Sequence, residues 1–251
     1  MEHPVFLFYF SPCGTTEKVG RAVAEGTGEE YTAYDLCDTA FCAPLLPAGS
    51  LAIFAGPIYG GQVPELALNR MQQINGENCF AGAVVSYGNR AYDDGLLQLG
   101  DVLEGAGFTL VGGGAFVCQH SCAPTVAAGR PKRDDITQAQ TFGAILYQRC
   151  DHPLPFTLPG KRPYKLLGGS HNAPVTSDSC IQCGICARRC PAGAIPEEDP
   201  TKTDPTLCIG CRRCVAICPG KARSFKGAMN AILRAALPVM AKNPRENEMF
   251  I

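Results

Sequence analysis

The stretch VFLFYFSPCGTTEKVGRAVAE, residues 5–25, joins two unlike patterns at a short turn rich in glycine and hydroxyl side chains. Residues 5–10 are apolar or aromatic without alternation, which is typical of a strand buried on both faces. From Thr16 to Glu25 the apolar residues recur at helical spacing. Because a buried strand that leads directly into a helix begins a βαβ unit, this stretch predicts a parallel α/β sheet.

The same alternation continues through roughly the first 150 residues. Further apolar runs lie at Leu51–Ala55, Ala81–Ser86 and Thr109–Val117, with a weaker one at Tyr31–Asp35. Helical patterns lie at Thr16–Glu25, Val63–Ile74, Asp94–Ala106 and Asp134–Cys150. Five strands in this length predict a doubly wound, five-stranded parallel sheet of the flavodoxin kind, with strand order 2-1-3-4-5.

The composition changes after Cys150 and divides the rest of the chain into three parts. Residues 151–173 contain several Pro and Gly without a period, which indicates a linker that wraps a surface. Residues 174–225 are dense in cysteine and predict a second, small α+β domain. Residues 226–251 predict a C-terminal helix that packs on the rest, followed by a tail that ends in apolar residues. The predicted domains are therefore 1–150, 174–225 and this C-terminal extension.

Two cysteine runs of the form C-x2-C-x2-C-x3-C-P begin at Cys180 and Cys208, 28 residues apart. In bacterial ferredoxins this spacing holds two [4Fe–4S] clusters, and the fourth cysteine of each run binds the other cluster. Zinc, the alternative, usually takes separated C-x2-C pairs and fits runs of four poorly. The predicted ligands are Cys180, Cys183, Cys186 and Cys218 for one cluster, and Cys208, Cys211, Cys214 and Cys190 for the other.

The overall composition excludes several classes of protein. The net charge is −1 and no Lys/Arg-rich block occurs, so the sequence argues against nucleic-acid binding. No apolar run reaches the length of a membrane span. The fifteen cysteines occur without an export signal, and clustered cysteines in a reducing compartment more often bind metal than form disulfides. We therefore expect a cytoplasmic protein without a membrane span.

The turn after the first strand is a candidate phosphate site. In doubly wound sheets the ligand lies beyond the carboxyl ends of the strands, where helix N-termini present free N–H groups. Ser11, Thr15 and Thr16 add hydroxyls there, and Gly14 allows the backbone to approach a ligand closely. Taken alone, these residues are more typical of an ordinary tight turn.

Three loops carry a resemblance to flavodoxins. Ser11–Thr16 resembles the flavodoxin phosphate loop, T/S-x-T-G-x-T, with Cys13 where that family usually has Thr. Gly56–Pro64 is similar to the loop whose aromatic residue stacks on the flavin ring, and Ser86–Asp94 resembles the G-D-x-x-Y loop. The resemblance implies FMN as cofactor, with contacts from Ser11, Cys13, Gly14, Thr15, Thr16, Pro57, Ile58, Tyr59, Gly60, Tyr87, Gly88, Asn89, Arg90 and Tyr92.

Nearly the whole chain resembles the flavodoxin–ferredoxin fusion proteins of anaerobes, in which the stretches YGNR (87–90) and H-S…G-R-P (120–131) recur. This implies an electron-transfer flavoprotein of oxidoreductase type, which passes single electrons between two [4Fe–4S] clusters and FMN. Its partner would be an external electron carrier or a small redox substrate. The alternative is a non-enzymatic redox sensor or ferredoxin carrier without FMN. The catalytic residues and the oligomeric state, a homodimer included, stay open.

Several single residues have a simpler interpretation. Tyr59 and Tyr92 could be surface residues at the rim of the sheet, and Arg90 a solvated partner of an acid. His120 is interpreted as structural or interdomain rather than catalytic. The cysteines outside the two runs and the phosphate turn are interpreted as small buried hydrophobic residues, namely Cys37, Cys42, Cys79, Cys118, Cys122 and Cys150.

Overall fold

The computed structural model describes residues 2–165 and 173–251. Its main feature is a six-stranded sheet with the order β2-β1-β3-β4-β5-β8. The strands β1 to β5 are parallel, so the predicted order 2-1-3-4-5 is confirmed. Their bounds are β1 Val5–Tyr9, β2 Tyr31–Asp35, β3 Leu51–Pro57, β4 Phe80–Tyr87 and β5 Thr109–Val117.

Four helices cover the two faces of this sheet, because its central strands are apolar on both sides. Every residue of β3 is buried. The helices α1 and α4 contribute Val23 and Phe142 to the core on one face, and α2 and α3 contribute Met71 and Leu103 to the core on the other. The four predicted helical patterns correspond to α1 Thr15–Gly26, α2 Glu65–Met71, α3 Gly95–Gly105 and α4 Arg133–Asp151.

The sixth strand comes from the end of the chain. Residues Glu248–Phe250 form β8, which pairs antiparallel with β5, so that Gly113 lies opposite Phe250. The sequence alone predicts only a docked tail here. The strand forms because β5 would otherwise leave one row of backbone N–H and C=O groups without partners at the sheet edge.

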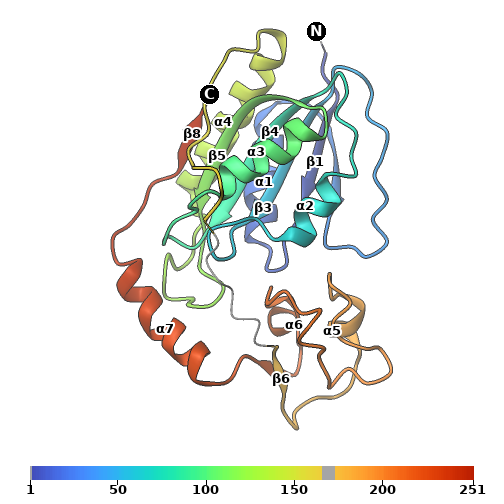
Figure 1. The fold of residues 1–251 in the computed structure, drawn as a ribbon, viewed down its shortest axis with the longest axis vertical. Helices are drawn as coiled ribbons and strands as arrows, with labels where there is room; N and C mark the ends of the chain where they lie inside the picture. The colour runs from blue at the N-terminus through green and yellow to red at the C-terminus, as the bar shows by residue number, and fades with distance from the viewer. Residues whose placement is uncertain (1, 166–172) are drawn as a thin grey trace.

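The cysteine-rich segment lies beyond the end of the sheet where the parallel strands finish (Figure 1). It contains the short helices α5 Ile185–Arg188 and α6 Arg213–Ala216. Its two ends meet in a small antiparallel ribbon of β6 Val175–Thr176 and β7 Arg223–Ser224. The segment is therefore a separate small unit that faces the carboxyl ends of the strands.

The connections on both sides of this segment contact the sheet domain. The described part of the predicted linker follows α3, where the Asp94 carboxylate accepts hydrogen bonds from the backbone N–H groups of Lys161 and Lys165 at 2.9 and 2.7 Å. Residues 166–172 of that linker lie outside the described residues. The prediction that the linker wraps a surface therefore agrees with the part that can be followed.

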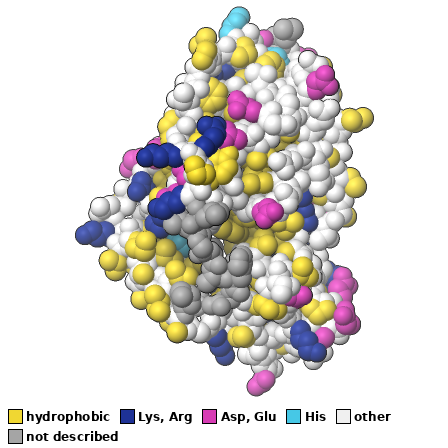
Figure 2. Space-filling model, viewed as in Figure 1, with side chains coloured by type: hydrophobic (Ala, Val, Ile, Leu, Met, Phe, Trp, Pro, Cys, Tyr) yellow, Lys and Arg dark blue, Asp and Glu magenta, His cyan; other side chains and the backbone are white. Residues whose placement is uncertain are grey.

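Helix α7, Ala228–Met240, corresponds to the predicted C-terminal helix. Its last turn packs on the sheet domain through Leu237 and the following Ala241. The side chains of Ile232 and Val239 are 60% and 70% exposed, and hydrophobic side chains gather where α7 lies (Figure 2). In residues 2–165 and 173–251, no helix is long and apolar enough to cross a membrane.

Candidate redox centres and the hollow at the sheet end

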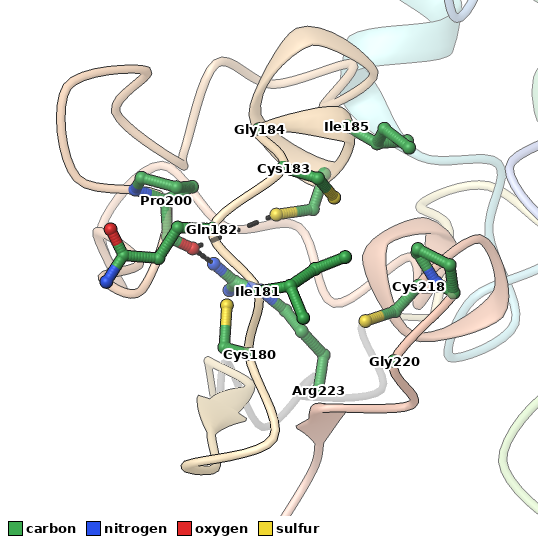
Figure 3. Close-up of a pocket in the computed structure, with 12 residues that line it drawn as sticks. Cys180, Ile181, Gln182, Cys183, Gly184, Ile185, Pro200, Cys218, Gly220 and Arg223 are labelled. Carbon is green, nitrogen blue, oxygen red and sulfur yellow. Dashed lines mark hydrogen bonds between the residues drawn. The ribbon is translucent and has the colours of Figure 1, made fainter.

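The first cysteine group consists of Cys180, Cys183, Cys186 and Cys218, and the structure places these four residues around one hollow of about 350 Å³. Three of them come from one run and the fourth from the other. Figure 3 shows Cys180, Cys183 and Cys218 lining this hollow. The Ile181 side chain beside it is 71% exposed, so this hollow lies near the outer surface of the segment.

The second cysteine group consists of Cys190, Cys208, Cys211 and Cys214, which line another hollow of about 350 Å³. Burial raises the pKa of the Cys208 and Cys211 thiols, and raises the pKa of Cys214 to about 12. These thiols therefore hold their protons near neutral pH when no metal is bound. A metal that binds here displaces those protons, because thiolates are the metal ligands.

The two groups are related by the 28-residue repeat. The backbone N–H of Ala194 donates to the Cys190 sulfur at 3.3 Å, and that of Ala222 donates to the Cys218 sulfur at the same distance. Such N–H···S bonds stabilise a thiolate that binds iron. Within the described residues, no three His, Cys, Asp or Glu side chains are spaced for a single metal ion. Four thiols around a hollow, with apolar walls and N–H donors to sulfur, fit an iron–sulfur cluster.

A third hollow, the sheet-end hollow, lies where β1, β3, β4 and β5 finish. It measures about 440 Å³ and is lined by the loops that follow these four strands. This is the place where doubly wound sheets bind their ligands. Its walls include Pro12, Cys13, Thr15, Thr16, Pro57, Ile58, Tyr59, Ser86, Tyr87, Gly88, Cys118, Gln119, His120 and Ser121.

The polar groups of the sheet-end hollow suit an anionic, hydrogen-bonding ligand. Helix α1 begins at the hollow, and its N-cap is Gly14, which has no side chain to cover the first N–H groups. The Tyr87 side chain is 3% exposed, and within the described part of the chain its hydroxyl has no hydrogen-bond partner. Tyr87 itself lines the hollow, and a buried hydroxyl without a partner is rare in native proteins, so a ligand that reached it would supply one. Burial also raises the pKa of Tyr87 to about 12, so the hydroxyl stays a donor.

The structure brings some of the predicted flavin contacts to this hollow and not others. Cys13, Thr15, Thr16, Pro57, Ile58, Tyr59, Tyr87 and Gly88 line it. Among the described residues, the lining does not include Ser11, Gly14, Gly60, Asn89, Arg90 or Tyr92. The Ser11 hydroxyl instead accepts the Glu17 N–H at 2.9 Å. The Thr16 hydroxyl, at the wall, already pairs with that of Ser86 at 2.7 Å.

The residues from the loop after β4 that point elsewhere have clear partners. Tyr92 is 8% exposed, and its hydroxyl donates to the Glu248 carboxylate of β8 at 2.9 Å. Arg90 pairs with Asp93. Asn89 binds the backbone of the C-terminal tail. Tyr87, the last residue of β4, is therefore the aromatic residue that lines the hollow here, rather than Tyr92.

The loop after β5 contributes His120, which was not predicted from the sequence to line a site. Its Nδ1 accepts the Cys122 N–H at 3.0 Å, so the neutral ring carries its proton on Nε2. Burial, together with the positive charges of Arg212 and Arg90, lowers the pKa of His120 to about 4. Because neighbouring strand ends share one edge, the topology alone could have pointed to this loop.

The cysteines outside the two groups fall into two classes. Cys37, Cys79, Cys118 and Cys150 are buried, as expected for small hydrophobic residues. That interpretation is wrong for Cys42, which is exposed, and for Cys122, which is only half-buried. The Cys122 sulfur accepts a hydrogen bond from the Arg212 guanidinium of the cysteine-rich segment at 3.0 Å.

Comparisons with known proteins address the two parts separately. Residues 179–223 match the model of the 4Fe-4S dicluster domain family. A stretch of 44 residues is 50% identical to one component of the ion-translocating oxidoreductase complex of Methanosarcina acetivorans. That stretch spans 17% of this chain and 17% of the length of that relative.

Among solved structures, oxidised flavodoxin 1 of Bacillus cereus is 18% identical, with a TM-score of 0.42, over 58% of this chain and 97% of that one. A flavodoxin of Fusobacterium nucleatum bound to flavin mononucleotide is 13% identical, with a TM-score of 0.42, over 59% of this chain and 98% of that one.

The fold and the cysteine groups together define a class of protein. The strand order 2-1-3-4-5 makes the sheet domain flavodoxin-like, independently of those likenesses. The match of residues 179–223 makes the following segment an iron–sulfur domain. The chain is thus a flavodoxin-like domain fused to a 4Fe–4S ferredoxin-type domain, which is an electron-transfer architecture.

Proposed function

We propose that the protein is an electron-transfer flavoprotein that passes single electrons between two [4Fe–4S] clusters and FMN. An external electron carrier or a small redox substrate would supply or take up the electrons, in the cytoplasm. The proposed division is a flavin domain at 1–150, a linker at 151–173, a two-cluster domain at 174–225 and a C-terminal helix and tail at 226–251. The observation that carries this proposal is the gathering of the eight run cysteines into two groups, the second of which contacts the sheet domain through Cys211 and Cys13.

The two cysteine groups would each hold one cluster through four thiolates. In each group the fourth cysteine comes from the other run, so each site needs both runs in place. The apolar side chains around them, such as Ile185 and Ile209, exclude water from the sulfurs. The Ala194 and Ala222 N–H groups offset part of the negative charge on Cys190 and Cys218.

The sheet-end hollow would hold FMN. The N–H groups of Thr15 and Thr16 at the start of α1 would bind the phosphate, with the helix dipole favouring its charge. The rings of Tyr59 and Tyr87 would border the flavin ring, and the unpaired Tyr87 hydroxyl would donate to it or to the ribityl chain. When bound, the flavin and the clusters supply a two-electron centre that exchanges single electrons with one-electron carriers.

Purification without oxygen tests this proposal through the cofactor content. We expect roughly eight iron atoms and about one FMN per chain, and a visible spectrum with both chromophores. Cys208→Ser should lower the iron content, whereas the matched control Cys42→Ser should not, because Cys42 lies outside both groups. Full iron without flavin would favour the redox sensor or ferredoxin carrier instead.

A reductive titration then tests the transfer itself. Reducing equivalents added to the loaded protein should distribute between flavin and clusters within one chain, because the domains are covalently joined. The colour changes of the two chromophores report this distribution. A protein in which the two chromophores never exchange electrons would contradict the proposed function.

A further inference from the structure

Among the described residues, side-chain hydrogen bonds between the cysteine-rich segment and the sheet domain gather around the second cysteine group. The Cys13 thiol donates to the Cys211 carbonyl at 3.4 Å, and Arg212 Nε donates to the Cys122 sulfur at 3.0 Å. Arg70 Nη2 of the sheet domain donates to the Pro191 carbonyl at 2.9 Å, next to Cys190. These contacts place residues of the sheet domain beside the second group.

A further contact tightens the same border. Arg213 pairs with Asp35 of β2 at 3.6 Å, and its side chain is 13% exposed. Around the first group, by contrast, Ile181 is 71% exposed and Cys183 is exposed. The order in space is therefore the sheet-end hollow, then the second group, then the first.

Arg212 occupies the border between the sheet-end hollow and the second group. It lines the hollow of the second group, and it contacts Cys122 in the same loop as His120, which lines the sheet-end hollow. Its Nη2 also donates to Asn230 Oδ1 of α7 at 2.9 Å, and its guanidinium lies 4.3 Å from the centre of the Phe225 ring. Three segments thus hold one permanent positive charge in place.

The backbone of Arg212 adds an independent observation. In the 28-residue repeat, Arg212 corresponds to Gly184, and both residues precede a short helix in the left-handed conformation, with φ of 64° and 71°. Glycine adopts this conformation freely, whereas for a residue with a side chain it costs about 1 kcal/mol or more. The second repeat places an arginine where the first has glycine, despite this backbone cost, which indicates that the Arg212 side chain has a role.

We infer that Arg212 couples the two redox sites: it is a positioning residue that holds the cluster of the second cysteine group against the flavin of the sheet-end hollow. This inference rests on the proposed function. With both cofactors bound, one electron would pass from that cluster to the flavin, which would oxidise the cluster and reduce the flavin by one electron. The cluster of the first group would then pass one electron to the cluster of the second group, and an external one-electron carrier would re-reduce the first. All three transfers can run in reverse.

The charge of Arg212 has a second effect on both sites. Each site gains negative charge when it is reduced, and a fixed cation nearby favours the reduced state. Arg188 is the matched residue at the first group, because its Nη2 donates to the Cys183 carbonyl at 3.2 Å. It should influence the first cluster alone.

The test compares Arg212→Gly, Arg212→Lys and Arg188→Gln in the full-length protein loaded with both cofactors. The readouts are the reduction potentials of the flavin and of each cluster, and the rate of electron exchange between flavin and clusters. Glycine suits the left-handed backbone, so Arg212→Gly should fold and keep its iron. We expect Arg212→Gly to shift the reduction potentials of the flavin and of one cluster to more negative values and to slow electron exchange between them. Arg212→Lys keeps the positive charge, so its reduction potentials should stay closer to those of the wild type.

Arg188→Gln should shift the other cluster and leave the flavin unchanged. If the Arg212 and Arg188 variants, loaded with both cofactors, shifted the flavin reduction potential by the same amount, the inference would be overturned and the proposed function would remain intact. Wild-type protein without flavin, or without exchange between flavin and clusters, would instead refute the proposed function and this inference with it. Loss of iron from Arg212→Gly but not from Arg212→Lys would show a structural role in cluster binding, against the coupling role.

Discussion

Asn89 fixes the C-terminal tail to the sheet domain, and replacing it should release that tail. Its side chain is 5% exposed, and its amide donates to the carbonyls of Ala241 and Asn243 at 2.7 and 3.0 Å. Its Oδ1 accepts the Arg245 N–H at 2.9 Å. The residue has φ of 62°, so Asn89→Gly removes the side chain in a backbone conformation that glycine accepts.

The expected cost follows from the three hydrogen bonds. At about 1 kcal/mol each, their loss should weaken docking of the tail by about 2–3 kcal/mol. The open tail would then be populated about 30- to 150-fold more, since about 1.4 kcal/mol corresponds to a tenfold change in an equilibrium constant. The amides of β8, residues 248–250, should exchange hydrogen faster by that factor.

Hydrogen exchange followed by mass spectrometry of the C-terminal peptide measures this effect. Tyr92→Phe is the matched control, because it removes a single hydrogen bond, 2.9 Å long, to Glu248 of the same tail. It should accelerate exchange only about fivefold, which corresponds to about 1 kcal/mol. If Asn89→Gly exchanged no faster than Tyr92→Phe, the reasoning that Asn89 is the main anchor would be refuted.

Three further predictions concern the fold and the sheet-end hollow. A Cβ at Gly143 of α4 would lie 1.9 Å from the Val23 carbonyl oxygen of α1. Gly143→Ala should therefore lower the free energy of unfolding, measured by urea titration, by about 1–3 kcal/mol. Gly105→Ala, which has open space around it, should instead raise the free energy of unfolding by up to about 1 kcal/mol. The pKa of His120 falls from 6.5 to about 4 on folding. Between these two pH values the unfolded chain binds a proton at His120 that the folded chain does not, so the free energy of unfolding should fall as the pH drops from 6.5 to about 4. His120→Gln should reduce this pH dependence. Tyr87→Phe should raise the melting temperature of flavin-free protein, because it removes a buried unpaired hydroxyl, and should weaken FMN binding in a fluorescence titration; unchanged FMN affinity would remove Tyr87 from the site.

The sheet was predictable because its signals are local. Each buried strand is a continuous apolar run next to a helical pattern, and short right-handed crossovers leave few possible orders for five parallel strands. The cysteine groups were likewise predictable, because the spacing within each run restricts which sulfurs can bind the same cluster. In both cases residues that act together lie close in sequence or repeat at a fixed interval.

The parts that sequence reasoning missed depend on contacts between distant segments. The three residues of β8 carry no periodicity, and they form a strand only because the edge of β5 is available. The choice between Tyr87 and Tyr92 was decided in the same way. The chain turns at Asn89 in a left-handed conformation, which leaves Tyr87 at the hollow and directs Tyr92 toward Glu248 of that added strand.

The tail also explains the stretch that ends in Gly129-Arg130-Pro131. Arg130 Nη1 donates to the Arg245 carbonyl at 2.8 Å, and Asn247 Oδ1 accepts the Val117 N–H at 2.9 Å. Asp135 joins this group through an ion pair with Arg130 and a hydrogen bond from Asn247 Nδ2 at 3.0 Å. These residues therefore hold the tail on the sheet domain.

The anchored tail gives the cysteine-rich segment a second attachment to the sheet domain. The chain is held to the sheet domain at Lys165 before the cysteine-rich segment and at Ala241 after it, so this segment and α7 lie between two points of attachment (Figure 1). A segment held at one end samples a wide volume, whereas a second attachment restricts it and raises its effective concentration at the remaining contacts. An interface between the cysteine-rich segment and the sheet domain stays formed for more of the time when both ends of the segment are attached. We therefore expect the anchors Asn89 and Arg130 to favour the arrangement in which Arg212 contacts Cys122, so that variants at either anchor should also weaken the proposed coupling.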